Sequence, residues 1–210
     1  MFVNDDVVRV RYVPEGEFVE NETNILVDSR PLKVNVRCRE NEEHIIMQSD
    51  KLIVKISKRN GAVSFYDNEG RLLLSENKTL PRSAEKVEIC NVVYDDTNSV
   101  IEKTANGDVK VSNIVSEQSI GNAWKAKVNY EWQEGEALYG LGSHQEPNYN
   151  LRGTMQYLYQ HNLKATVPVL MSSLGYGLLF NVGSTMEFHD DKDGSYMQMN
   201  AVNSVDYIFM

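Results

Sequence analysis

The chain has 210 residues and a formal net charge of −9, with 21 lysines and arginines against 30 aspartates and glutamates. A nucleic-acid partner or an anionic membrane surface requires a basic face, so this acidic balance argues against both. The longest apolar runs, such as YGLLFNV and VPVLMSS, are far shorter than the roughly 20 residues that span a bilayer.

The N-terminus and the cysteines say little about the compartment. Met1 is followed by FVNDDVVRV, which has acidic residues where a secretory signal has basic ones, so no signal is visible. Cys38 and Cys90 are too few for a disulfide framework, and neither lies in a metal-type pair. We expect two buried thiols rather than a bridge, and the localisation stays open.

Alternating apolar and polar residues dominate the chain and predict half-buried β-strands. The clearest of these runs are rich in β-branched and aromatic residues, which favour strands. They are Val7–Val13, Lys33–Arg39, Lys51–Ser57, Asp108–Val115 and Ala123–Trp132.

Turn residues separate these runs at the spacing of hairpins. Asn60-Gly61 and Asn106-Gly107 predict tight type I′ turns, and Asn68–Gly70 and Asp193-Gly194 predict further turns. Pro81–Ile89 has room for one short helical turn at most. The pattern of roughly fifteen strands predicts an all-β fold, a large antiparallel β-sandwich forming one domain over residues 1–210.

The last third is rich in glycine and aromatic residues, and it holds the first candidate sites. Gly140-Leu141-Gly142 lacks the third glycine and the following helix of a dinucleotide-binding motif, so we expect no phosphate cofactor. His144 and Glu146 have the chemistry of a general acid and base. A surface loop with hydrogen-bonding side chains explains the same pair of residues better.

Three other groups have simpler explanations. His161 lies between Gln160 and Asn162, whose amides suit sugar hydroxyls but suit the loop backbone better. His189–Asp191 predicts a solvated acidic turn rather than a metal site, because adjacent side chains point apart. Trp124 and Trp132 share a strand face and are typical of a core. We expect no cofactor and no metal.

An ordered set of motifs then resembles a known family. ALYGLGSHQ, NLRG and YQHNLKATVPVLMSSLGYGLLFNVGS follow one another over about fifty residues. In this order they resemble the N-terminal domain of glycoside hydrolase family 31, the α-glucosidases and α-xylosidases. NDDVVRVRYVPEG near the start is similar to an early strand of that family, more weakly.

The resemblance implies a galactose-mutarotase-like sandwich that precedes a (β/α)8 catalytic barrel. In the family the barrel carries both carboxylates of a retaining glycosidase. The nucleophile motif Trp-x-Asp-Met-Asn does not occur here, so we expect no catalytic residue in this chain and no hydrolysis by the chain alone. The implied partners are the protein's own C-terminal barrel and the oligosaccharide substrate.

The resemblance also implies that a loop of this domain helps to shape the sugar subsite. That loop would be drawn from Gln145–Asn162, with Asn150, Arg152, Gln160, His161 and Asn162 as candidate substrate-binding residues. Turn stabilisation and contact with the barrel explain the same residues equally well.

Two alternatives remain at this level. One is a free-standing carbohydrate-binding module. The other is a mutarotase-like epimerase, with His144 and Glu146 or His161 as acid and base, which rests on fold analogy alone.

Overall fold

The computed structural model describes residues 1–18, 34–105, 107–145 and 148–210. These residues form fifteen strands and no helix, and the strands of both sheets pair in antiparallel registers, which confirms the predicted all-β fold. They divide into unit 1, Met1–Glu85 with Trp124–Met210, and unit 2, Lys86–Ala123. The single domain over residues 1–210 stays a prediction.

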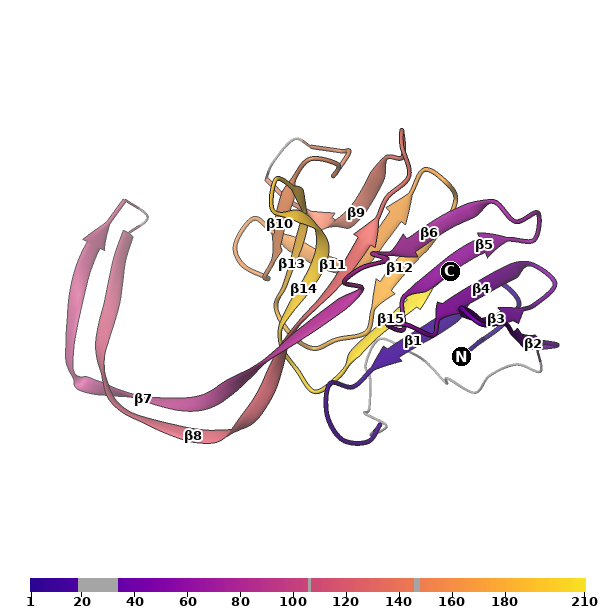
Figure 1. Cartoon of the computed structure of the whole chain (residues 1–210). Helices are drawn as coiled ribbons and strands as arrows, with labels where there is room; N and C mark the ends of the chain where they lie inside the picture. Colours follow the sequence, from indigo (N-terminus) through magenta and orange to yellow (C-terminus); the bar gives the residue numbers. More distant parts are fainter. Residues whose placement is uncertain (19–33, 106, 146–147) are drawn as a thin grey trace. The chain divides into compact units, whose positions relative to one another are not determined.

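Unit 1 contains a five-stranded sheet, which includes the end of the chain (Figure 1). Its strands, in spatial order, are β1 (Val8–Tyr12), β15 (Val205–Phe209), β12 (Gly177–Phe180), β11 (Ala165–Ser172) and β9 (Leu138–Ser143).

The second sheet joins early and late strands of the chain. Its order is β10 (Met155–Leu158), β13 (Met186–Asp191), β14 (Gly194–Val202), β8 (Gly107–Glu131), β6 (Leu72–Glu76), β5 (Val63–Asp67), β4 (Leu52–Ser57), β3 (His44–Gln48) and β2 (Arg37–Glu40). The strand β7 (Arg82–Thr104) also pairs with β8. Only the part of β8 from Trp124 onward belongs to unit 1.

The core lies between these two sheets and is formed by their inward-facing apolar residues. Phe65 of β5 stacks on Phe209 of β15, with ring centroids 4.1 Å apart and an angle of 2° between the planes. Both rings are almost completely buried. Alternate residues of a strand face the same side, so the predicted period of two explains which side chains enter this core.

One polar group is buried inside the core. The carboxylate of Glu76 is fully buried and accepts hydrogen bonds from the Arg82 guanidinium, the Val63 N–H at 2.9 Å and the Tyr207 hydroxyl at 2.6 Å. Burial raises the pKa of Tyr207, and the nearby Glu76 charge raises it further, so this hydroxyl stays protonated and donates. A buried charge of this kind requires such partners.

Three of the four predicted turns lie wholly among the described residues and are present, one of them with a different type. Between β4 and β5, Gly61 has a φ of +73° but Asn60 is not in the left-handed region, so the loop is not a type I′ turn. Instead the N–H of Gly61 donates to the Ser57 carbonyl at 2.9 Å, and the N–H of Ser57 donates to the Ala62 carbonyl at 2.8 Å. This closes a longer loop.

The other turns agree with the prediction. Asn68–Gly70 connects β5 to β6, and the Gly70 N–H donates to the Asp67 carbonyl at 3.1 Å. Asp193-Gly194 connects β13 to β14. Asn106 of the predicted Asn106-Gly107 turn lies outside the described residues.

Unit 2 consists of the parts of β7 and β8 that lie between Lys86 and Ala123. Pro81–Ile89, for which the sequence allowed one short helical turn at most, contains no helix, because β7 begins at Arg82 and pairs with β8. Two strands form a single layer, so the unit itself does not cover its apolar side chains. Those most exposed are Tyr94, Val100, Ile101, Val115 and Ile120.

The cysteines do not lie where the sequence predicted, whereas Trp132 does. Cys38 and Cys90 are free and exposed, so the expectation of buried thiols is wrong. Cys38 lies in β2, whose side chains are all exposed. Trp132 packs against the core, as expected.

Candidate functional site

The turn between β9 and β10 is fixed by Asn150. Its Oδ1 accepts hydrogen bonds from the N–H groups of Leu138 and Arg152, both at 3.1 Å. The next residue, Leu151, donates its N–H to the Leu138 carbonyl at 2.8 Å and buries its side chain in the core. Asn150 therefore holds this turn against the start of β9.

Arg152 ties the same turn to two other segments. Its Nε donates to Asp190 Oδ2 of β13 at 2.7 Å, and its Nη1 donates to the carbonyls of Gln133 at 3.2 Å and Glu136 at 3.0 Å. Its side chain is 30% exposed. These contacts are those of a residue that stabilises the turn.

Asp190 is the anionic partner in this arrangement. Burial acts to raise the pKa of its carboxyl group, but hydrogen bonds from Ser195, Gly153 and Arg152, with the Arg152 charge, outweigh burial and lower that pKa. The expected solvated turn at His189–Asp191 is wrong, because the three residues belong to β13 and both His189 and Asp190 are buried.

A second buried carboxylate lies next to this turn, and the sequence analysis did not identify it. Glu136 accepts hydrogen bonds from Ser172 Oγ at 2.6 Å, the Tyr176 hydroxyl at 2.5 Å and the Gln133 N–H at 2.6 Å. Burial and the hydrogen bond to Glu136 raise the pKa of Tyr176. Two of these partners are 36 and 40 residues away along the chain, so no local pattern predicts the cluster.

Gln160, His161 and Asn162 form a second turn, and all three are exposed. The Gln160 side chain donates to the Lys164 carbonyl at 2.5 Å and accepts from the Thr166 N–H at 3.2 Å. The Asn162 carbonyl accepts a hydrogen bond from His161 Nδ1 at 2.8 Å. Among the described residues, no hydrogen bond or ion pair joins this turn to Asn150 or Arg152.

A row of exposed rings leads into this second turn. Tyr157, Tyr159 and His161 alternate along the chain, with 6.0 Å between the centroids of each neighbouring pair. Tyr157 is 40% exposed and Tyr159 is 49% exposed. Exposed aromatic rings beside amide groups provide an apolar surface and polar contacts together, which is the requirement for binding a sugar ring. The high density of tyrosines in the last third of the sequence is the feature that could have predicted these exposed rings.

The glycines of Gly140-Leu141-Gly142 serve close packing rather than a turn. They lie within β9, and both have φ values near +100°. A β-carbon at Gly140 would overlap the Val169 carbonyl oxygen of β11, and one at Gly142 would overlap the Ala165 carbonyl oxygen. The register between β9 and β11 shifts at this point, as in a β-bulge. The segment is therefore a bulged strand whose glycines permit close packing on β11.

A pocket of about 360 Å³ adjoins this bulge, within the size range of ligand sites. His144 lines it, and its Nε2 donates to the Leu141 carbonyl at 2.9 Å. Its Nδ1 is buried without a partner among the described residues. Glu146 lies outside the described residues, so the proposed acid–base pair stays a prediction.

Neither a metal-ligand cluster nor a membrane-spanning helix occurs among the described residues. In that part of the chain no group of three or more His, Cys, Asp or Glu side chains is placed to hold a metal ion. No helix there is long and apolar enough to cross a membrane.

Comparisons with known proteins agree on one family. The family of the glycosyl hydrolase 31 N-terminal galactose mutarotase-like domain matches residues 1–189. An uncharacterized family 31 glucosidase of Pseudescherichia vulneris is 31% identical over 150 residues, which cover 70% of this chain and 26% of that protein. An alpha-xylosidase of Saccharolobus solfataricus is 25% identical over 190 residues, covering 86% of this chain and 21% of that protein.

Solved structures show the same fold. A GH31 alpha-xylosidase from a soil metagenome, in complex with xylose, superposes with a TM-score of 0.70 at 23% identity. The match covers 99% of this chain and 29% of that one. The chain thus spans about a quarter of the length of the curated relatives named above.

Proposed function

Because this chain belongs to the family of glycosyl hydrolase 31 N-terminal galactose mutarotase-like domains, we propose that it serves an α-glycosidase, an α-glucosidase or an α-xylosidase, as its non-catalytic domain. The observation that carries this proposal is the family match over residues 1–189. The relatives bear the names of a glucosidase and an alpha-xylosidase, which supports the choice of reaction.

The proposed partner is the catalytic barrel of the same protein. The small share of its relatives' length that this chain spans supports a larger enzyme with a separate catalytic part. In this proposal residues 1–210 form one domain that supports the barrel. Hydrolysis with retention needs two carboxylates on either side of the scissile bond, and the barrel supplies both.

The proposed contribution to the oligosaccharide site comes from the second turn. Gln160, His161 and Asn162 contact the substrate, next to the rings of Tyr157 and Tyr159. The exposure of this turn and its mixture of amides and rings support such a role.

Asn150 and Arg152 have a different proposed role, which is to position the loop rather than to contact the substrate. Their hydrogen bonds to Leu138, Asp190 and Glu136 fix the course of the chain that leads to the second turn. We propose that they act on the substrate by positioning this loop.

Hydrolysis assays test the proposal. The native protein should release nitrophenol from an aryl α-glucoside or α-xyloside, and the 210-residue chain alone should not. Hydrolysis by the pure 210-residue chain would contradict the proposal, as would a native protein without activity on either substrate.

Variants of the native enzyme test the loop. Asn162→Ala and Tyr159→Ala should raise KM for an oligosaccharide about 5- to 30-fold with little change in thermal stability, because each removes roughly 1–2 kcal/mol of contact. The matched control is Asn98→Ala, an exposed asparagine of unit 2 whose side chain bonds only to Asp95 within the described residues. An unchanged KM in both loop variants would assign the turn a purely structural role.

A further inference from the structure

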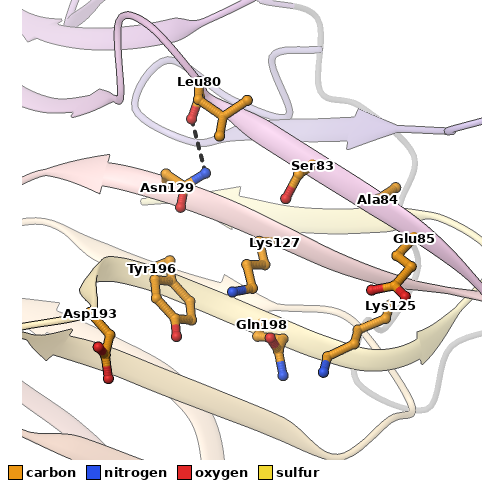
Figure 2. Close-up of a pocket in the computed structure, with 10 residues that line it drawn as sticks. All are labelled: Leu80, Ser83, Ala84, Glu85, Lys125, Lys127, Asn129, Asp193, Tyr196 and Gln198. Carbon is orange, nitrogen blue, oxygen red and sulfur yellow. Dashed lines mark hydrogen bonds between the residues drawn. The ribbon is translucent and has the colours of Figure 1, made fainter.

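The outer face of the second sheet carries a polar pocket of about 450 Å³, and none of the candidate substrate-binding residues lines it (Figure 2). Three neighbouring strands, β7, β8 and β14, provide its walls. Lys125 and Lys127 of β8 alternate with Ala126 and Val128, which are buried in the core. The two lysines therefore point to the outer side of the sheet.

The residues that lie opposite on β14 are polar as well. Gln198 of β14 lies opposite Lys127, and Tyr196 lies opposite Asn129. Asn129 is held in place by its Nδ2, which donates to the Leu80 carbonyl at 2.9 Å (Figure 2). Gln198 Nε2 donates to Asn200 Oδ1 at 2.9 Å. These bonds fix the side chains before any ligand arrives, which lowers the entropic cost of binding.

Tyr196 presents its hydroxyl edge rather than its ring face. His189, its partner on β13, stacks on the ring with 4.5 Å between centroids, and Lys127 Nζ lies 4.2 Å from the ring centroid. Because β14 lies between β13 and β8, these two neighbours occupy opposite ring faces. The ring is thus unavailable for stacking, and the site binds through hydrogen bonds.

The charges of the pocket balance. Lys125 and Lys127 face Glu85 and Asp193, which also line it. In the described part of the chain, neither lysine nor Glu85 forms an ion pair, and Asp193 has only a 4.0 Å contact with Lys192. The ammonium groups donate, the carboxylates accept, and the hydroxyls of Ser83 and Tyr196 do both. The side-chain carbonyl of Gln198 accepts, because its Nε2 already donates to Glu187 and Asn200. Sugar hydroxyls also both donate and accept, whereas an anion would meet two carboxylates and a cation would meet two lysines.

We propose that this pocket is a second saccharide-binding site, which takes a neutral oligosaccharide and performs no chemistry on it. The choice of an α-linked glucose oligomer as ligand rests on the proposed function. Without a free aromatic face, we expect a Kd of about 1 mM, corresponding to about −4 kcal/mol.

Titration of the ¹⁵N-labelled chain with maltotriose, followed by amide NMR, tests this site. Saturable shifts should appear in residues 83–85, 125–129 and 193–198. Lys127→Met and Lys125→Met should each weaken binding at least fivefold, because methionine keeps the apolar stem and removes the donor. The control is Lys55→Met, since Lys55 Nζ lies over the Tyr66 ring at the same 4.2 Å, outside the pocket. It should change the Kd by less than twofold.

Three results would overturn the proposal. They are the absence of shifts up to tens of millimolar sugar, shifts confined to Tyr157–Asn162, and saturable shifts with inorganic phosphate but not with maltotriose. Shifts confined to Tyr157–Asn162 would overturn this pocket and leave the proposed function unaffected. The hydrolysis assay on the native protein tests the proposed function separately. If Lys127→Met does not fold, Lys125→Met makes the same test, because Lys125 has no ring contact among the described residues.

Discussion

The bulge in β9 gives the sharpest prediction about stability, the effect of Gly142→Ala. The φ of Gly142 is +101°, a region that L-residues rarely adopt, so the backbone strain costs about 1–3 kcal/mol. The new methyl group would overlap the Ala165 carbonyl oxygen and lie 2.8 Å from the Val167 nitrogen. These atoms belong to the backbone of β11 and cannot rotate away, which adds about 1–3 kcal/mol of overpacking.

We therefore expect Gly142→Ala to lower the free energy of unfolding by about 2–6 kcal/mol, a large share of the stability of an ordinary domain. Urea unfolding of the 210-residue chain, followed by tryptophan fluorescence, measures it. Gly183→Ala is the matched control, because a β-carbon at Gly183 meets nothing within 4 Å and its φ is not left-handed. It should change stability by less than about 1 kcal/mol. Equal midpoints for the two variants would refute the reasoning.

Two further predictions concern buried carboxylates, and urea unfolding measures both. Asp190→Asn should cost about 2 kcal/mol at pH 7, because Asp190 loses charge-assisted bonds from Arg152. The pKa of Asp190 is lowered in the folded protein, so its contribution to the free energy of unfolding is present above about pH 4 and is lost as pH falls through the folded value. The difference in stability between Asp190→Asn and wild type should therefore shrink in acid. A difference that grows in acid would contradict this. Arg82→Met should cost about 3–5 kcal/mol, because the Glu76 carboxylate stays buried without its cation. Burial raises the pKa of Glu76, and the Arg82 charge opposes this, so without Arg82 the ionised carboxylate is more costly and the loss of stability should increase as pH rises. A cost below about 1 kcal/mol would show that the pair is not important for stability.

Local pattern was sufficient for most strands of the fold. In Leu52–Ser57 and Val63–Asp67, buried and half-buried residues alternate over the first four positions, and turn residues separate the two strands, so period and turn chemistry agree on both. The same reasoning left Pro81–Ile89 open, because it allowed one short helical turn at most, and pairing with β8 selects a strand there. Long-range pairing overrides weak local preference, and the sequence does not display it.

The candidate site was predictable only in part, for a related reason. Asn150 and its turn have a local signature, because an asparagine side chain bonds the backbone two residues on. The ion pair of Arg152 joins residues 38 positions apart, and Glu136 meets Ser172 and Tyr176 across a similar separation. Such contacts are set by how two sheets pack, which no window of the sequence contains.

The mass of the native protein tests the central claim most directly. An antibody raised against this chain would detect it on a denaturing gel of the source cells. A domain of a larger α-glycosidase predicts a band several times heavier than the chain's own 23.9 kDa. A single band at about the mass of the chain would contradict the account, because the sandwich would then act without a catalytic barrel.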